Sequence, residues 1–146
     1  MGQFSSTATF PCTPEALRSY LGNPANLPNI TDPELNLQVL EAPDTVAEGE
    51  EIEFSIHAWG FPQRIRHRWV TVTDQQIIVE QVEGPTESWR HEQTITAAPE
   101  GCLLTETISF EPPGGMLGYI LTEDAIRQSL ESGTAIRIEL LTRQLA

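Results

Sequence analysis

The chain has 146 residues, 39% of them hydrophobic, which is enough for one domain with one sizeable core. It carries 21 acidic residues against 8 basic ones, a formal net charge of −13, so it would repel nucleic acids and anionic membranes. Nucleic-acid binding is therefore excluded first, and the lack of an apolar run of about 18 residues excludes a membrane-spanning helix.

The N-terminal part of the chain predicts a strand followed by two short helices. Residues 3–11 alternate between apolar and polar positions, which is strand periodicity. Thr13 then offers an N-cap and Pro14 a first helical residue, so a short helix should run to about Leu21. The stretch 23–28 is either a turn or a second, one-turn helix.

From Asp32 to about Glu111 the pattern has a period of two, which predicts strands. Turn residues interrupt it at Pro43 and Gly49, Gly60–Pro62, Asp74-Gln75, Gly84-Pro85 and Pro99–Gly101. Alternating runs separated in this way are typical of an antiparallel meander. We expect six strands here, and with the first strand they make a sheet of about seven.

After Pro112–Gly115 the sequence predicts one long helix, capped by Thr122. Its apolar positions recur at steps of three and four and predict one inward stripe, formed by Ile126, Leu130, Gly133, Ile136 or Arg137, and Leu140. Gly133 costs about 1 kcal/mol in mid-helix relative to Ala. We therefore expect close packing on the sheet, or a slight bend, at this residue.

The order strand, two short helices, six strands and long helix predicts an α+β domain in which a sheet curls around a helix and leaves a volume between them. This order resembles that of the START-like (SRPBCC) superfamily, which includes the birch-pollen allergen and polyketide cyclase/dehydratase relatives. Glu80–Pro85 with Trp89-Arg90-His91 resembles the "E-Q-x-x-G-P…W-x-H" run of bacterial members. Thr105-Glu106 with Phe110-x-Pro112-x-Gly114 resembles their "T-D-x-V-x-Y-x-P-x-G" segment. The resemblance implies a helix-grip fold over one domain, residues 1–146, with an internal cavity.

Strand parity and the helical stripe select the residues that should line this cavity. Every second residue of a strand faces the same side, which groups His67 with Trp69, and His91 with Gln93. The predicted ligand-binding residues are Phe54, Ile56, His67, Trp69, Trp89, His91, Gln93, Glu106, Ile108, Phe110, Ile126 and Leu130.

His91 and Glu106 are the candidate catalytic residues. If they lie side by side on adjacent strands, they form a buried acid–base unit that polarises a ligand carbonyl or hydroxyl, or moves a proton in a cyclase or dehydratase. The alternative interpretation is structural and carries more weight: the two side chains satisfy each other and fix the strand register.

A ladder of three arginines, Arg64, Arg66 and Arg68, faces one side of a predicted strand. Three guanidinium groups in a row are suited to an anionic headgroup or phosphate. In a chain this acidic we favour an exposed outer face on which they pair with carboxylates such as Glu53 or Glu80.

Trp59 and Phe61, near a sheet end, are expected at a pocket rim or an oligomer contact. The three histidines lack metal-ligand spacing, so no metal site and no cofactor are predicted. Cys12 and Cys102 show no CxxC spacing and no export signal precedes them. We expect two free thiols, and the cytoplasm as the compartment.

These patterns favour a protein that binds or carries a small hydrophobic ligand, such as a lipid, a polyketide or an aromatic metabolite. One alternative is a cyclase- or dehydratase-type enzyme that uses His91 and Glu106, and another is a non-catalytic interaction module. The bare outer face of the sheet leaves room for a homodimer. The identity of the ligand does not follow from the sequence.

Overall fold

The computed structural model describes all 146 residues. Its elements follow the chain in the order β1 (Gly2–Phe10), α1 (Pro14–Leu21), η1 (Pro24–Ile30), η2 (Pro33–Leu35), β2 (Gln38–Glu41), β3 (Glu51–Ala58), β4 (Phe61–Val72), β5 (Gln76–Glu83), β6 (Ser88–Ala98), β7 (Gly101–Glu111), η3 (Gly115–Tyr119) and α2 (Glu123–Gln144), where η marks a 3₁₀ helix. The strands form one antiparallel sheet in the order β1-β7-β6-β5-β4-β3-β2. The fold class predicted from the sequence, an α+β helix-grip fold, is confirmed.

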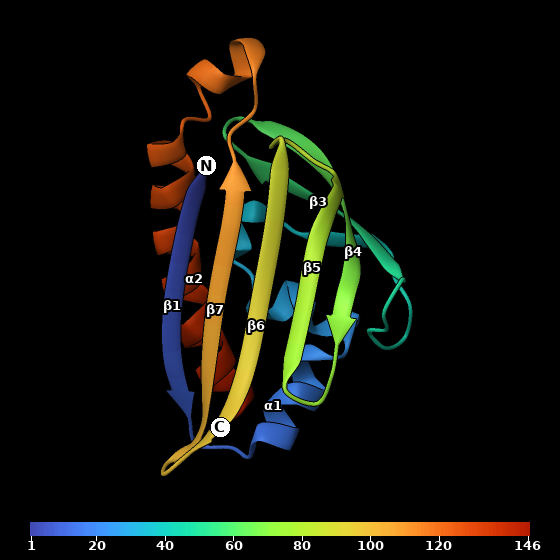
Figure 1. Cartoon of the computed structure of the whole chain (residues 1–146), viewed down its shortest axis with the longest axis vertical. Coiled ribbons are helices and arrows are strands. Elements are labelled where there is room, and N and C mark those ends of the chain that lie inside the picture. The colour runs from blue at the N-terminus through green and yellow to red at the C-terminus, as the bar shows by residue number, and fades with distance from the viewer.

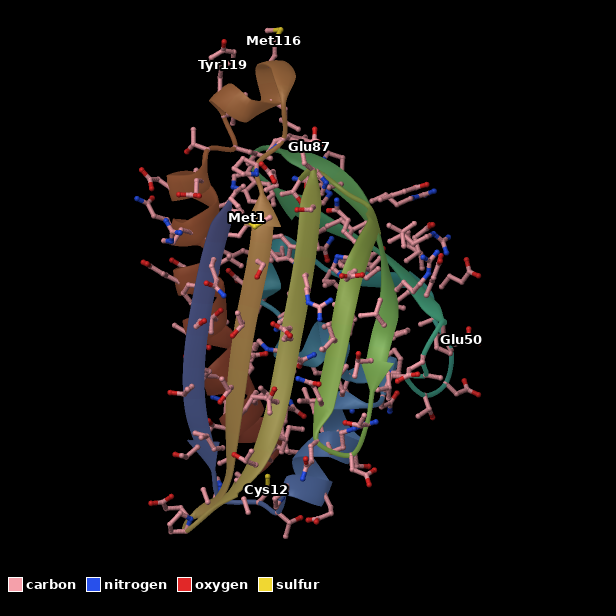
Figure 2. The ribbon with its side chains drawn as sticks, viewed as in Figure 1. Met1, Cys12, Glu50, Glu87, Met116 and Tyr119 are labelled. Carbon is pink, nitrogen blue, oxygen red and sulfur yellow. The ribbon has the colours of Figure 1, made fainter.

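The sheet curves around its helices (Figure 1). The long helix α2 lies behind β1 and β7, whereas α1 lies at the lower end of the sheet in this view, where it contacts β6 and β7. The short helix η3 projects beyond the sheet, and its Met116 and Tyr119 side chains, 85% and 86% exposed, point away from the body (Figure 2). Neither α-helix is long and apolar enough to cross a membrane.

Strand β7 illustrates why the sheet buries one face. Its odd-numbered residues from Gly101 to Ser109 are half-buried, and its even-numbered ones, from Cys102 to Phe110, are buried. This alternation is expected of a strand with one face on the core. The core falls into three clusters. The first lies around Phe10, Leu17 and Leu104, the second around Phe54 and Trp69, and the third around Phe110.

The second predicted strand is shorter than its alternation suggested, because its first residues form the capped 3₁₀ helix η2 instead. The Asp32 carboxylate accepts a hydrogen bond from the backbone N–H of Glu34, and Pro33 fixes the first residue of η2. Asn36 then turns the chain with a positive φ of 47°. Strand β2 therefore begins at Gln38, not near Asp32.

Helix α2 begins after Thr122 as predicted, and the Thr122 hydroxyl accepts a hydrogen bond from the N–H of Ala125. Its buried residues are Ile126, Thr134 and Leu141, and Leu130 and Leu140 of the predicted stripe are partly buried against the core clusters. No atom beyond the local helix would lie within 4 Å of a Cβ at Gly133. The expectation of close packing at this glycine was therefore wrong, since Gly133 faces open space.

Candidate functional site

Two adjoining cavities lie between the sheet and the helices. The outer cavity has a volume of about 760 Å³. Its apolar wall comes from η2 and the residues just after it, from the strands β3, β4 and β6, and from the β3–β4 turn. The side chains are Leu35, Leu37, Phe54, Ile56, Trp59, Ile65 and Trp89. The inner cavity, of about 220 Å³, shares Leu37, Phe54, His67 and Trp89 with the outer one, so the two are continuous in their lining.

Helix α2 leaves room for the outer cavity because most of its residues there are small. Ala125, Ser129, Ser132 and Gly133 line the cavity together with Gln128, and none of the five carries a long apolar side chain. The glycine that costs helix stability thus coincides with the open volume. Larger residues at these positions would occupy the space between the helix and β3.

Apolar residues of β3–β5, among them Ile52, Trp69 and Val79, face apolar residues of α1 and η1, among them Leu21, Leu27 and Ile30, across the inner cavity. Its polar groups come from Tyr20, Asn23, Asn26, His67, His91, Gln93 and Arg137. The register of β6 and β7 explains part of this arrangement. Gln93 pairs with Glu106, and His91 lies two residues away on the same face.

A buried network connects α2 to the two strands. Arg137 donates from Nε to Glu106 Oε1 at 2.9 Å and from Nη2 to Gln93 Oε1 at 2.7 Å. His91 Nε2 lies 3.2 Å from the same Glu106 oxygen. Glu106 is only 4% exposed, so this carboxylate depends on protein partners rather than on water.

The charge state of Glu106 follows from these partners. Burial alone would raise the pKa of its carboxyl group, but Arg137 and His91 outweigh burial and hold the pKa at about 2. At neutral pH Glu106 is therefore a carboxylate that accepts hydrogen bonds. It is not poised to donate a proton.

His67 differs from the residues of this network because it makes no hydrogen bond to another protein group. It lines both cavities, and its ring meets that of Phe54 edge-on, with centroids 5.3 Å apart. Its neighbour in register, Gln81, is already engaged with Thr86 through two hydrogen bonds. Burial, with a smaller contribution from His91, lowers the pKa of His67 to about 3, so the imidazole is neutral at neutral pH.

Of the twelve residues predicted to bind a ligand, seven line a cavity: Phe54, Ile56, His67, Trp69, Trp89, His91 and Gln93. Glu106 lies behind them, with its carboxylate bound by Arg137 and His91. Ile108, Phe110 and Ile126 form a core cluster with Leu121, and Leu130 packs against that cluster. These five residues line neither cavity, because α2 lies behind β1 and β7 and covers the inner face there (Figure 1).

Sequence reasoning missed several polar residues of the site. Arg137 appeared only as one option for an apolar stripe, although an arginine on an inward helix face calls for a buried acid such as Glu106. Asp32 and Glu34 line the outer cavity from a segment that was expected to be a strand. Nothing in the local sequence signals that these two carboxylates face a cavity.

Trp59 lines the outer cavity from the two-residue turn between β3 and β4. Trp59 and Gly60 both have positive φ, 54° and 87°, as a type I′ turn requires. A tryptophan is rarely found in this conformation. Phe61, the other residue expected at the rim, is exposed and lines neither cavity.

The arginine ladder of β4 lies among carboxylates. Arg66 contacts Glu53 at 2.6 Å and Glu51 at 3.1 Å, and Arg68 also contacts Glu51. Arg64 lies 3.6 Å from Glu53. The predicted pairing with Glu53 is therefore present. Glu80, the other expected partner, instead binds Arg90 at 2.7 Å.

Comparisons with known proteins agree with this architecture. The family described as "Polyketide cyclase / dehydrase and lipid transport" matches residues 1–135. Protein CV1439 from Chromobacterium violaceum is 13% identical, with 99% of this chain and 98% of that chain covered and a TM-score of 0.77. Major latex-like protein 151 from Panax ginseng is 13% identical, with coverages of 99% and 97% and a TM-score of 0.72.

The di-domain ARO/CYC protein StfQ from the steffimycin biosynthetic pathway is also similar, with 13% identity and a TM-score of 0.76. The match covers 98% of this chain but 50% of StfQ. At such identities the similarity shows a shared fold alone. No curated protein matches the sequence.

Proposed function

Because the chain belongs to the polyketide cyclase/dehydrase and lipid transport family, we propose that it binds or carries a small hydrophobic molecule in its two adjoining cavities. The observation that carries this proposal is the size of the outer cavity, about 760 Å³. Ligand sites in proteins usually measure about 300–1,000 Å³, whereas an unoccupied packing defect is much smaller.

The lining supports an apolar ligand. Phe54, Trp59 and Trp89 present aromatic surface, and burial of apolar ligand surface against such walls contributes roughly 25 cal/mol per Å². Apolar residues are also the majority in the lining of the inner cavity, 12 of 19. Affinity would then come from burial, and the polar groups would set the orientation of the ligand.

An enzyme of the cyclase or dehydratase type is the second candidate, favoured by the family and by the presence of His91 in the inner cavity. The geometry does not support Glu106 as the acid of such an enzyme. Its carboxylate lines neither cavity and is bound by Arg137 and His91. In this second function His91 would be the base, with Glu106 holding its ring in place.

Native mass spectrometry of the purified protein tests the binding proposal first, because a carried molecule should co-purify. The uncharged fluorophore N-phenylnaphthylamine then gives a dissociation constant. We expect Gly133→Leu to raise this constant at least about tenfold, since the new side chain enters the open space of the outer cavity.

Ala135→Leu is the matched control, because it places the same leucine side chain at an exposed position of the same helix. The dissociation constant of this variant should equal that of the wild type. If the probe binds equally well to the wild type and to Gly133→Leu, ligand binding in the outer cavity is refuted.

Glu106→Gln and His91→Ala separate a carrier from an enzyme. A carrier should keep its ligand with altered affinity in both variants. An enzyme that uses His91 as a base should lose at least about a hundredfold in turnover in His91→Ala while it still binds substrate.

A further inference from the structure

The cavities contain no free positive charge. The chain has eight basic residues, all arginine, and Arg137 is the only one that lines either cavity. Its side chain is 14% exposed, and it is already bound to Glu106 and Gln93. The charges of Arg137 and Glu106 cancel, so the pair offers no net attraction to an anion.

The negative charges of the site lie at the outer cavity. Asp32 and Glu34 line it, and neither forms an ion pair with an arginine. A carboxylate ligand in the outer cavity would share it with these two acids, which repel it. Inside, it would be a buried charge without a counter-ion, which is far more costly than a buried hydroxyl that finds a hydrogen-bond partner.

His67 supplies such a partner. It lies where the two cavities meet, makes no hydrogen bond to the protein, and is neutral because burial lowers its pKa to about 3. A neutral imidazole has one N–H donor and one acceptor nitrogen. It can therefore pair with either a hydroxyl or a carbonyl group of a ligand, and neither of these groups carries a charge.

We propose that the cavity selects an uncharged ligand with a hydroxyl or carbonyl group that binds His67, and that the pairing of Arg137 with Glu106 excludes carboxylates. This inference rests on the proposed function, since it assigns the chemical class of the ligand that the cavities hold. Fatty acids and other organic anions of suitable size are therefore poor ligands, whereas alcohols, ketones and neutral phenols of the same skeleton are good ones.

Three anthracenes that differ only in one substituent test the selection. Methylanthracene, (hydroxymethyl)anthracene and anthracenecarboxylate are titrated into the wild type by fluorescence at pH 8, above the ordinary pKa of an imidazole. We expect the alcohol to bind about fivefold more tightly than the hydrocarbon, the gain from one hydrogen bond. The carboxylate should bind at least about tenfold more weakly than the alcohol.

His67→Phe tests the anchor, because it keeps an aromatic ring and removes both nitrogens. In this variant the alcohol should lose its advantage over methylanthracene, so the ratio of the two dissociation constants should fall to about one. An unchanged advantage would show that the hydroxyl is held elsewhere and would overturn the assignment of His67.

Glu106→Gln tests the exclusion of anions by a gain of binding. It leaves the Arg137 charge without its carboxylate partner, so the affinity for anthracenecarboxylate should rise at least about tenfold. The double variant Glu106→Gln with Arg137→Gln removes both charges and should lose this gain. If Glu106→Gln brings no gain, the Arg137–Glu106 pair does not set the selectivity.

The wild-type titrations distinguish failure of this inference from failure of the proposed function. If none of the three anthracenes binds, the cavities do not hold apolar ligands and both proposals fail. If methylanthracene binds and the carboxylate binds as tightly as the alcohol, the proposed function stands and the selection of uncharged ligands is refuted. Both outcomes come from the wild type, so they do not depend on whether a variant folds.

Discussion

The titratable side chains on the inner face of the sheet have different partners and therefore different roles. Glu106 has Arg137 and His91, which offset the cost of burying its charge. His67 has no such partner, and it stays uncharged instead. This contrast decides which group can serve a ligand: Glu106 is occupied, and His67 is available.

His67 should make the stability of the protein depend on pH. Its pKa is about 3 in the folded state and 6.5 ordinarily, so between these values the unfolded state binds more protons. The free energy of unfolding should therefore fall as pH drops below about 6.5, with a further loss below 4.5 from Glu106, whose pKa is lowered to about 2. Urea denaturation at pH 7, 6 and 5 measures the loss of stability that is due to His67.

In His67→Phe the decline between pH 6.5 and 5 should be smaller than in the wild type. Ile65→Val, on the same inner face of β4, changes packing without changing a titratable group and should keep the wild-type slope. A wild-type slope in His67→Phe would mean that His67 is not the group that titrates on unfolding.

The two cysteine thiols differ in exposure, so we expect them to differ in reactivity. Cys12 and Cys102 lie with their Sγ atoms 3.9 Å apart, and Cys12 is partly exposed whereas Cys102 is buried. Burial, together with Cys12, raises the pKa of the Cys102 thiol to about 11. Because the thiolate is the nucleophile, we expect iodoacetamide at pH 8 to modify Cys12 first and Cys102 much more slowly.

A time course by mass spectrometry measures this difference, with Cys12→Ser and Cys102→Ser to assign the two phases. The slow phase should accelerate roughly tenfold per pH unit toward pH 11. Equal rates for both thiols at pH 8 would contradict the burial of Cys102.

Strand parity predicted some of these side chains well. It placed His91, Gln93 and Glu106 on one face, and the structure brings Glu106 within hydrogen-bond distance of His91. Parity can be assigned from the sequence, because successive side chains of any strand point to opposite faces of the sheet. Arg137 could not be assigned in the same way, because the rotation of a helix about its axis depends on what it packs against.

At the scale of single elements, Trp59 of the β3–β4 hairpin has an unfavourable backbone conformation, but its side chain lines the outer cavity. Trp59 has φ 54° in a type I′ turn, a position at which asparagine is much better tolerated. We expect Trp59→Asn to raise the free energy of unfolding by about 1 kcal/mol, measured by urea denaturation. The same change should weaken the binding of N-phenylnaphthylamine, since Trp59 lines the outer cavity.

Phe61→Asn, two residues later and outside both cavities, serves as the control for ligand binding and should leave the affinity unchanged. A destabilised Trp59→Asn would show that the contacts of the indole outweigh the cost of its backbone conformation.

The bounds of the elements were predictable where local signals agree and not where they compete. Thr122 and its following acids correctly mark the start of α2. At Asp32 the capping of η2 competes with a period of two, and the cap prevails. In the predicted stripe of α2, Ile126, Leu130 and Leu140 do pack on the core, whereas Gly133 faces the outer cavity.

For the molecule as a whole, the order of elements predicted the fold, but it did not predict which part of the concave face stays open. Ile108 and Phe110 face inward as expected, yet they lie under α2 and pack in the core. Phe54 and His67 also face inward and line the cavities. The difference arises because α2 lies behind β1 and β7, and no residue pattern within a strand encodes the position of a distant helix.

Charge also acts at this scale. Seven of the eight arginines form ion pairs with carboxylates, most of them exposed, yet the net charge remains −13. An exposed ion pair contributes about 0–1 kcal/mol, whereas repulsion among the excess acids extends over a Debye length of about 30 Å at 0.01 M salt. Added salt weakens both the ion pairs and the repulsion. Because acids are in excess, we expect the loss of repulsion to be larger, so that salt stabilises the protein.

We therefore expect the melting temperature to rise by about 3 °C or more when NaCl is raised from 0.01 to 0.5 M, as measured by differential scanning calorimetry. Glu50 and Glu100 are exposed and have no basic partner, so replacing both with Gln should raise the melting temperature at low salt and reduce the effect of added NaCl. Glu53→Gln, which removes a partner of Arg66, should instead lower the melting temperature. If added salt lowers the melting temperature of the wild type, the ion pairs of the outer face outweigh the repulsion among the acids.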